Sequence, residues 1–206
     1  NNIDISVVMA GDGQMDPTQI NKLIEPLKSD LSDYAKGNRF MQYTKLRLMP
    51  RGRLIGNSVL SFLVKVVSGY WNVMDPTNGF TAIRAEVLKE MDLSKIAKRY
   101  FFETDMLIHL NIINAFVTDI DIPARYGEEK SSLCIWKTMI QFPPKLLKGF
   151  LKRIFLKYFI YDFNMASVYI LTGFPMFILA VILLGTFLIF LFSKLNVSFL
   201  FKYLLL

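Results

Sequence analysis

The segment that follows Asp162 constrains the fold of this chain most strongly, because it contains no charged side chain and no histidine until Lys194. Residues 166–192 within it are almost wholly apolar, and this length is sufficient to span a bilayer. A core helix of a soluble domain does not need so long an apolar stretch. A second apolar run begins at Leu195, so the sequence predicts a transmembrane helix and the start of a second, as a hairpin over residues 163–206.

Charge is distributed unevenly along the chain. Eight of its 24 Lys and Arg residues but only one of its 17 acidic residues lie in residues 136–206, so this part carries the whole net charge of +7. A basic region beside an apolar span favours contact with anionic lipid headgroups rather than nucleic acid, and it favours the cytoplasmic side of the membrane. The single Cys134 excludes an internal disulfide and fits a reducing compartment.

The region before the span has the pattern of a helix that lies in the membrane interface. Between Lys145 and Tyr158, apolar side chains recur on one helical side and basic side chains on the other. We therefore expect residues 136–162 to form a basic amphipathic interfacial segment, which joins the span to an α/β domain in residues 1–135.

An acidic turn near the N-terminus stands between a predicted strand and a predicted helix. The apolar run of residues 5–9 is typical of a buried strand, and the turn Gly11-Asp12-Gly13-Gln14-Met15-Asp16-Pro17 follows it. Asp16 has the position of a helix N-cap, and Pro17 suits a first turn. Ligands of open α/β sheets bind at the carboxyl ends of strands. Asp12 and Gln14, a carboxylate and an amide, suit a hard divalent cation that also binds phosphates.

Further polar motifs follow along the α/β domain. Lys36-Gly37-Asn38-Arg39 ends a predicted strand over residues 33–39, and Asp75-Pro76-Thr77-Asn78-Gly79-Phe80 contains the turn signals of a predicted strand–turn–strand. Asp105 lies at the start of a predicted helix. The remaining pattern predicts a loop over 40–53, helices over 54–68 and 84–90, and a strand over 116–123.

The acidic turn, residues 36–39 and residues 75–80 resemble, in this order, the motifs of the family-two glycosyltransferases of GT-A fold. They are most similar to the polyprenyl-phosphate sugar transferase group, to which dolichyl-phosphate mannose synthase belongs. The resemblance covers residues 3–135, and a membrane hairpin after this domain is also typical of bacterial members. It implies a Rossmann-like GT-A domain in which most of the nucleotide pocket precedes the acidic turn. We therefore expect this sequence to be incomplete at both ends.

The resemblance also implies functions for individual residues. Asp12 and Gln14 would hold Mg²⁺ or Mn²⁺, although Ala10 stands where the family motif has its first Asp. Donor diphosphate oxygens and waters would then complete the coordination. Asp105 occupies the family's acidic position near the acceptor, and Asp75 begins the second turn, so both are candidate catalytic residues. Each also has an ordinary structural explanation: an acid favoured by the helix dipole for Asp105, and a turn former for Asp75.

A polyprenyl phosphate acceptor is already anionic, so it needs cations to position it rather than a general base. Arginine suits this task because its guanidinium binds phosphate through two parallel hydrogen bonds. Each of the candidate arginines, Arg51, Arg53 and Arg125, could equally be a solvated loop residue. We assign no metal-binding role to His109. The predicted acceptor phosphate-binding residues are Arg51, Arg53, Arg125, Lys130 and Ser131.

The sequence thus predicts a membrane-anchored, inverting glycosyltransferase on the cytoplasmic face of the cytoplasmic membrane. It would transfer a sugar from a UDP- or GDP-sugar donor to a polyprenyl phosphate. Two alternatives stay open. The acceptor could instead be a polysaccharide or a glycolipid, or the chain could be a non-catalytic membrane scaffold with a decayed transferase domain, as Ala10 suggests.

Overall fold

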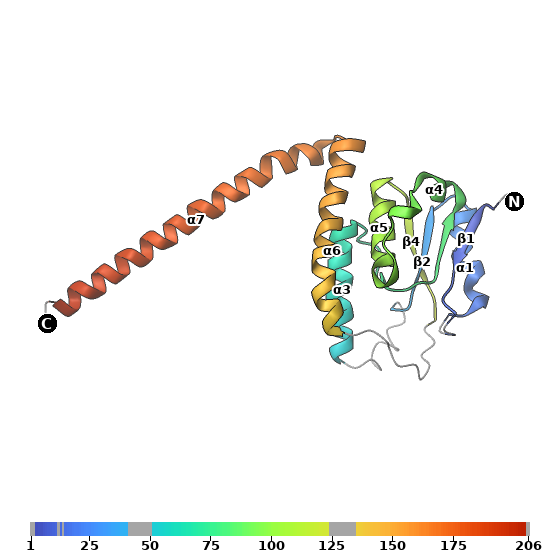
Figure 1. Cartoon of the computed structure of the whole chain (residues 1–206), viewed down its shortest axis with the longest axis horizontal. Helices are drawn as coiled ribbons and strands as arrows, with labels where there is room; N and C mark the ends of the chain where they lie inside the picture. Colours follow the sequence, from blue (N-terminus) through green and yellow to red (C-terminus); the bar gives the residue numbers. More distant parts are fainter. Residues whose placement is uncertain (1–2, 12, 14, 41–50, 124–134, 205–206) are drawn as a thin grey trace. The chain divides into compact units, whose positions relative to one another are not determined.

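The computed structural model describes residues 3–11, 13, 15–40, 51–123 and 135–204, with backbone alone for 51–55, 57, 135–140 and 195–204. The chain forms two compact units, Asn1–Tyr161 and Asp162–Leu206. The first unit combines a sheet with helices on both of its faces, and the second consists of one long helix (Figure 1). The α/β class predicted for the first unit is confirmed.

The sheet of the first unit is mixed. Strand β3 lies between β1 and β2 and is antiparallel to both, whereas β2 and β4 are parallel, giving the order β1-β3-β2-β4. Because of these directions, the carboxyl ends of β1, β2 and β4 and the start of β3 all lie at one edge of the sheet. The strands are β1 (Ile5–Val8), β2 (Tyr34–Asn38), β3 (Thr81–Arg84) and β4 (Val117–Asp121).

Helices cover the sheet in layers. Helix α1 packs on one face, α5 lies on the other, and α3 and α6 run side by side beyond α5 (Figure 1). The helices and helical turns of the first unit are η1 (Pro17–Gln19), α1 (Ile20–Lys28), α3 (Arg51–Ser68), α4 (Ala85–Glu90), η2 (Leu93–Lys95), η3 (Arg99–Phe101), α5 (Phe102–Ile112), α6 (Ile135–Phe155) and the π-helical turn η4 (Leu156–Tyr161).

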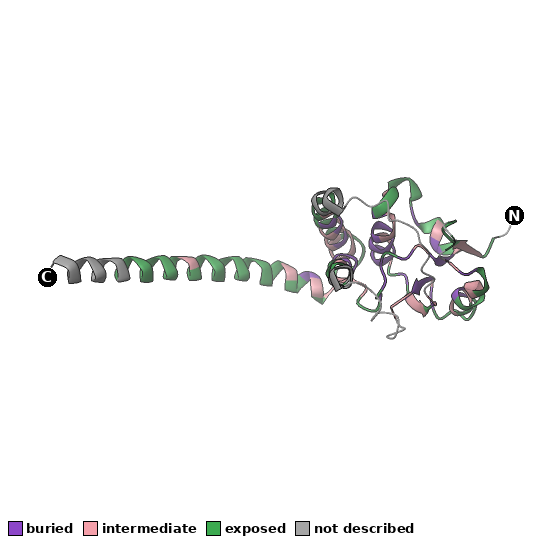
Figure 2. Cartoon of the chain, turned by 90° about the horizontal axis from the view of Figure 1, so that it is seen from below, coloured by how far each residue is buried: buried purple, intermediate pink, exposed green. Residues whose placement is uncertain are grey.

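The alternation of side chains along the strands divides the core between the two faces. Tyr34 and Ile83 pack toward α3 and α5, whereas the adjacent Ala35 and Ala82 pack against Leu23 and its neighbours on α1. Figure 2 shows the buried residues concentrated in the strands and in the helix faces that meet them. A third cluster joins α3, α5 and α6. The sheet is therefore fixed from both sides.

Two predicted boundaries were wrong. The loop predicted over residues 40–53 ends earlier, because α3 already begins at Arg51. The predicted strand–turn–strand contains only its second strand, Thr81–Arg84. In the preceding turn, Pro76 has no amide hydrogen for a ladder, and buried Asp75 forms side-chain hydrogen bonds instead.

Cations of α6 and η4 bind the ends of two neighbouring helices. Arg153 is 6% exposed, and its Nε donates to the carbonyl of Val67 near the end of α3 at 2.7 Å. Lys157 of η4 donates from Nζ to the carbonyl of Asn111 near the end of α5 at 3.1 Å. Both helix ends carry unpaired carbonyls and the negative pole of the helix dipole. These two cations of the predicted basic interfacial segment therefore bind protein carbonyls.

Gly69 makes room for this contact and yields a prediction. Its φ is +81°, and a β-carbon there would lie 2.7 Å from Nη1 of Arg153. We expect Gly69→Ala to lower the free energy of unfolding by about 2 kcal/mol through backbone strain and displacement of Arg153. Denaturant unfolding in detergent would measure this. The matched control is Gly56→Ala in α3, where a β-carbon meets nothing within 4 Å, and it should be neutral or stabilising.

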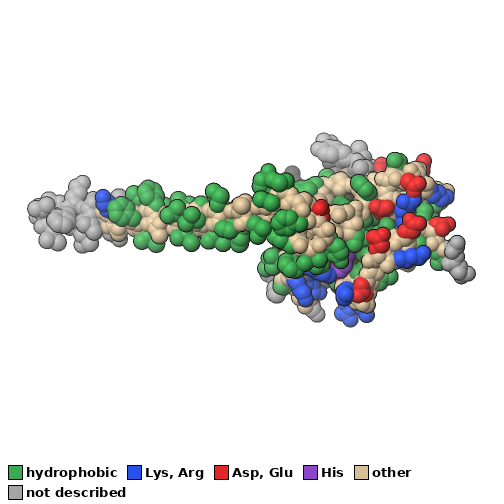
Figure 3. Space-filling view, turned by 90° about the horizontal axis from the view of Figure 1, so that it is seen from above, with side chains coloured by type: hydrophobic (Ala, Val, Ile, Leu, Met, Phe, Trp, Pro, Cys, Tyr) green, Lys and Arg blue, Asp and Glu red, His purple; other side chains and the backbone are tan. Residues whose placement is uncertain are grey.

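The second unit is the helix α7 (Met165–Leu204). Its segment Met165–Lys194 is the one helix of the described residues that is long and apolar enough to cross a membrane, and this segment is exposed along most of its length. Figure 3 shows hydrophobic side chains along it, whereas charged side chains gather on the first unit. The predicted hairpin is not shown, because the backbone stays helical through the region where the second span was expected to begin.

Candidate active site

A buried ion pair stands at the edge where β2 ends. Arg39 directly follows β2, and its Nε and Nη2 donate to the two carboxylate oxygens of Asp75 at 2.7 and 3.1 Å. The Asp75 side chain is fully buried, and Arg39 is 29% exposed. Thr77 also donates from Oγ1 to Oδ1 of Asp75 at 3.1 Å. With both oxygens engaged in this way, the carboxylate fixes the guanidinium.

The turn before β3 is fastened to β2 by its own side chains. Asn78 donates from Nδ2 to the carbonyl of Gly37 at 2.8 Å, and its Oδ1 accepts from the amide of Phe80 at 3.1 Å. Lys36 donates from Nζ to the carbonyl of Asn78. Because Asn78 and Lys36 are buried, these bonds hold the turn in one position against the sheet.

Asp119 of β4 links the same two segments. Its Oδ2 accepts from Nδ2 of Asn38 at 2.8 Å and from the amide of Met74 at 2.7 Å, while Asn38 also caps the amide of Phe40. The second oxygen, Oδ1, is buried without a hydrogen-bond partner in the described structure. Asp119 therefore joins the end of β2 to the segment that carries Asp75.

The electrostatics of this edge are unusual for a strand end. Lys36 is fully buried, and desolvation lowers its pKa from 10.5 to about 8, although the carboxylates of Asp75, Glu103 and Asp119 favour its charged form. Burial raises the pKa of Glu103 and of Asp119, and the Lys36 charge opposes both shifts. Perturbed ionisable groups that gather at one edge of a sheet are typical of functional sites.

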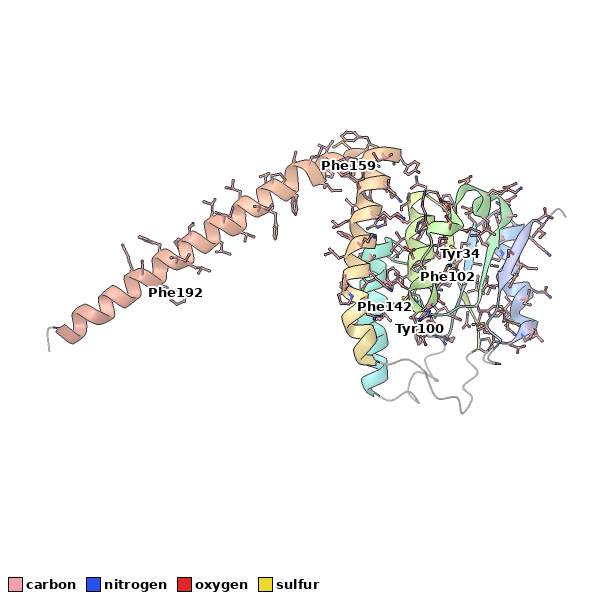
Figure 4. All side chains as sticks on the ribbon, viewed as in Figure 1. Tyr34, Tyr100, Phe102, Phe142, Phe159 and Phe192 are labelled. Atoms are coloured by element: carbon pink, nitrogen blue, oxygen red, sulfur yellow. The ribbon has the colours of Figure 1, made fainter. Side chains whose placement is uncertain are left out.

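The acidic turn is close to this cluster. A β-carbon on Gly79 would lie 3.7 Å from both Oε1 of Glu103 and Cε of Met15, so both side chains lie beside the turn before β3. Met15 directly follows Gln14. Figure 4 shows Phe102, the neighbour of Glu103 on α5, and Tyr34 of β2 where α5 faces the strands. The cluster therefore lies beside the turn that carries the predicted metal ligands.

Asp16 has the capping role predicted for it. It is the N-cap of η1, and its Oδ1 accepts from the amide of Thr18 at 3.0 Å and from the Thr18 hydroxyl at 2.8 Å. The predicted metal ligands Asp12 and Gln14 themselves lie outside the described residues. Within the described residues, no group of three His, Cys, Asp or Glu side chains could hold a metal ion.

Most side chains predicted to bind the acceptor phosphate also lie outside the part of the chain that the structure describes. Arg51 and Arg53 belong to the first turn of α3, with side chains that are not described, and they follow the segment that leaves the Arg39 end of β2. The structure does not describe Arg125, Lys130 and Ser131. Their assignment as phosphate-binding residues stays a prediction.

Asp105 has identified partners inside the protein. Its Oδ2 accepts from the amide of Ala97 at 2.7 Å, and its Oδ1 lies 3.6 Å from Nδ1 of His109. This carboxylate holds the segment before α5 in place. A catalytic role for Asp105 stays a prediction, while Asp75 is engaged by Arg39 as described above.

Four charged residues of the cluster were not predicted as site residues: Lys36, Arg39, Glu103 and Asp119. One available signal was the presence of Lys36 within the short strand β2, since a buried lysine needs acidic partners. For Glu103, the sequence supported equally well an acid that merely stabilises the start of α5.

Comparison with known proteins identifies relatives with a consistent activity. The chain is 31% identical over 125 residues to the UDP-N-acetylglucosamine–dolichyl-phosphate N-acetylglucosaminyltransferase of Methanococcus voltae, covering 61% of this chain and 49% of that protein. It is 29% identical over 133 residues to the undecaprenyl-phosphate mannosyltransferase of Micrococcus luteus, covering 63% and 54%. These relatives confirm the resemblance to polyprenyl-phosphate sugar transferases.

The same comparisons define the extent of the similarity. The chain spans about half the length of these two relatives. No family model matches it. Among solved structures, the glucosyl-3-phosphoglycerate synthase of Mycobacterium tuberculosis, crystallised with phosphoglyceric acid, matches 74% of this chain and 50% of its own chain, with a TM-score of 0.49 and 17% identity.

Proposed function

We propose that this chain is part of a membrane-anchored, inverting glycosyltransferase that moves a sugar from a nucleotide-diphosphate donor to a polyprenyl phosphate. The observation that carries the proposal is the similarity to two transferases whose names specify lipid phosphate acceptors. The apolar helix α7 and the polar cluster beside the acidic turn are consistent with it. The donor would be a UDP- or GDP-sugar.

The residues of the acidic turn fit a divalent cation. Asp12 and Gln14 offer a carboxylate and an amide oxygen, the hard donors that Mg²⁺ and Mn²⁺ accept, and they follow the carboxyl end of β1. Within this turn Asp16 caps a helix, which leaves Asp12 as the carboxylate for the metal. Asp75, in the turn before β3, is bound by Arg39. When bound, the cation would neutralise charge on the leaving diphosphate.

The remaining residues of the site would bind and orient anionic groups. Arg39, at the same sheet edge, supplies a cation held in a fixed orientation by Asp75, so we assign Asp75 a positioning role. Arg51 and Arg53 at the start of α3, with Arg125, Lys130 and Ser131, would hold the acceptor phosphate. Asp105 would orient the acceptor end of the site through α5.

The outward side of α6 suits a membrane surface. Leu147, Leu151 and Phe155 recur every four residues and are 57–59% exposed, while Lys145 and Lys148 are exposed beside them. Helices of this kind lie in the lipid interface with apolar side chains inserted and lysines at the headgroups. With α7 as a span, this arrangement would keep the active site at the cytoplasmic surface, where a lipid-linked acceptor is available.

A transfer assay tests the proposal. Membranes from cells that express the complete gene product would receive polyprenyl phosphate and a panel of labelled UDP- and GDP-sugars, with untransformed cells as the control. We expect label in a lipid fraction from which mild acid releases the sugar. Label confined to a water-soluble polymer or to a glycolipid without phosphate would support the alternative acceptors. Absence of transfer from every donor would support the scaffold alternative.

Asp12→Ala is expected to reduce metal-dependent transfer about 100-fold or more, because the leaving diphosphate then lacks its bound cation. Transfer would be measured across a Mg²⁺ and Mn²⁺ titration. The matched control is Asp16→Asn, which removes a carboxylate from the same turn but keeps a helix cap, and should stay within about twofold of wild type. Normal transfer by Asp12→Ala would contradict the metal-binding role.

A further inference from the structure

A chain of polar contacts connects α6 with the first turns of α5. Nζ of Lys152 on α6 lies 2.8 Å from Nε2 of His109, and Nδ1 of His109 lies 2.8 Å from the carbonyl of Asp105. Asp105 in turn accepts from the amide of Ala97. The side chains of His109 and Asp105 are each 12% exposed. His109 thus bridges two helices from a mostly buried position.

The two contacts of His109 specify its protonation state. A lysine ammonium can only donate, so Nε2 must be an acceptor, and Nδ1 must carry the single proton that is donated to the carbonyl of Asp105. This is one tautomer of the neutral imidazole. A second proton would remove the lone pair on Nε2 and place two positive charges 2.8 Å apart. The contact therefore exists only while His109 is neutral.

The contact joins two functionally different parts of the chain. Helix α5 carries Glu103 and Asp105 in its first turn, and Glu103 meets the turn before β3. Helix α6 continues through η4, and three residues separate the end of η4 at Tyr161 from the start of α7 at Met165. A change in the packing of α6 on α5 would therefore alter the positions of Glu103 and Asp105 in the first turn of α5.

We propose that the Lys152–His109 contact is a pH-sensitive latch between α6 and α5, with His109 as a positioning residue for the site. Neutral His109 fastens α6 to α5, and protonated His109 repels Lys152 and loosens α6. The link between α5 and the active site rests on the proposed function, whereas the latch itself rests only on these contacts. A contact that exists only with a neutral imidazole is broken by protonation, so the latch is sensitive to acid.

Charged groups of opposite sign flank the imidazole. On α5, the Asp105 carboxylate lies 3.6 Å from Nδ1, and on α6 the Lys152 ammonium lies 2.8 Å from Nε2. The next cations, Arg153 of α6 and Lys157 of η4, bind Asn111 and the end of α3 and do not depend on the protonation of His109. Protonation should therefore loosen α6 around Lys152 without releasing it completely.

Hydrogen exchange of the full chain in detergent micelles tests the latch. Amide exchange of peptides from residues 141–155 would be compared at pH 8.0 and pH 5.5, after correction for the intrinsic pH dependence of exchange. We expect about fivefold faster corrected exchange at pH 5.5, because the charge-assisted hydrogen bond is lost. Peptides from residues 20–28, which form α1 on the sheet face opposite α5, should show no change, which separates loosening from general unfolding.

Variants identify the groups responsible. His109→Gln keeps an acceptor for Lys152 but cannot be protonated, so it should abolish the pH-dependent difference while α6 stays protected. Lys152→Met should also abolish the difference, with less protection at both pH values. Lys148→Met removes an exposed lysine of the same helix and should behave as wild type.

Nuclear magnetic resonance gives a second readout, because His109 is the single histidine of the chain. With ¹⁵N-labelled histidine, the wild type at pH 8.0 should show the tautomer protonated at Nδ1. The opposite tautomer would overturn the proposal, as would equal corrected exchange of residues 141–155 at the two pH values in the wild type. Neither readout depends on transfer activity, so failure of the proposed function and failure of the latch are distinguishable.

Discussion

Arg39→Met is expected to lower the free energy of unfolding by about 3 kcal/mol, because it leaves the fully buried carboxylate of Asp75 without its cation. Methionine preserves much of the volume of the arginine stem, so little of this loss should come from packing. The amide of residue 39 and the hydroxyl of Thr77 remain as donors to Asp75 and keep the loss from being larger. Denaturant unfolding of the chain in detergent, followed by near-ultraviolet circular dichroism, would measure it.

Replacing the acidic partner, Asp75, should lower the free energy of unfolding less than Arg39→Met does. Asp75→Asn leaves Arg39 without a carboxylate, but Arg39 is partly exposed and can be solvated, so we expect a loss of about 1–2 kcal/mol. The double variant removes both charges of this pair and should be more stable than Arg39→Met alone, with a coupling energy of about 1–3 kcal/mol. Equal losses for the two single variants, or strict additivity in the double variant, would contradict this account of the pair.

Local patterns in the sequence predicted much of the fold. Alternation of apolar residues marked β4, helical spacing marked α1 and α5, and Asp16 with Pro17 predicted the start of η1 as the structure shows it. Local patterns were insufficient where tertiary contacts decide the conformation. Residues 73–78 have apolar members typical of a strand, but the buried carboxylate of Asp75 needs Arg39, and this pairing replaces ladder hydrogen bonds with a turn.

The candidate site was predictable only in part, for a related reason. The acidic turn and the Asp75 turn could be recognised because each is a compact motif in the sequence. The pairing of Lys36 with Glu103 could not, because it depends on the arrangement of β2, β3 and α5, and no sequence spacing indicates it. The basic pattern of α6 predicted lipid contacts, whereas Lys152, Arg153 and Lys157 bind neighbouring helices, a choice that depends on where α3 and α5 end.

The buried ammonium of Lys36 should make the stability of the chain depend on pH in the alkaline range. The pKa of Lys36 is about 8 in the folded chain against an ordinary value of 10.5, because its side chain is fully desolvated. Between these values the unfolded chain binds more protons than the folded chain. Stability therefore rises as the pH increases from 8 toward 10.5, and this gain is lost as the pH falls back through 8.

We expect the free energy of unfolding to rise by about 1.5 kcal/mol between pH 8 and pH 9.5 in the wild type, relative to Lys36→Met. Methionine fills a similar volume and has no proton to release, so the comparison isolates the ammonium. Above pH 10 the trend should reverse, because burial raises the pKa of Tyr34 and Tyr70, which then favour the unfolded, ionised chain. Lys89→Met, on the exposed side of α4, should keep the wild-type slope. A wild-type profile parallel to that of Lys36→Met over this range would show that Lys36 does not titrate from a buried, charged state.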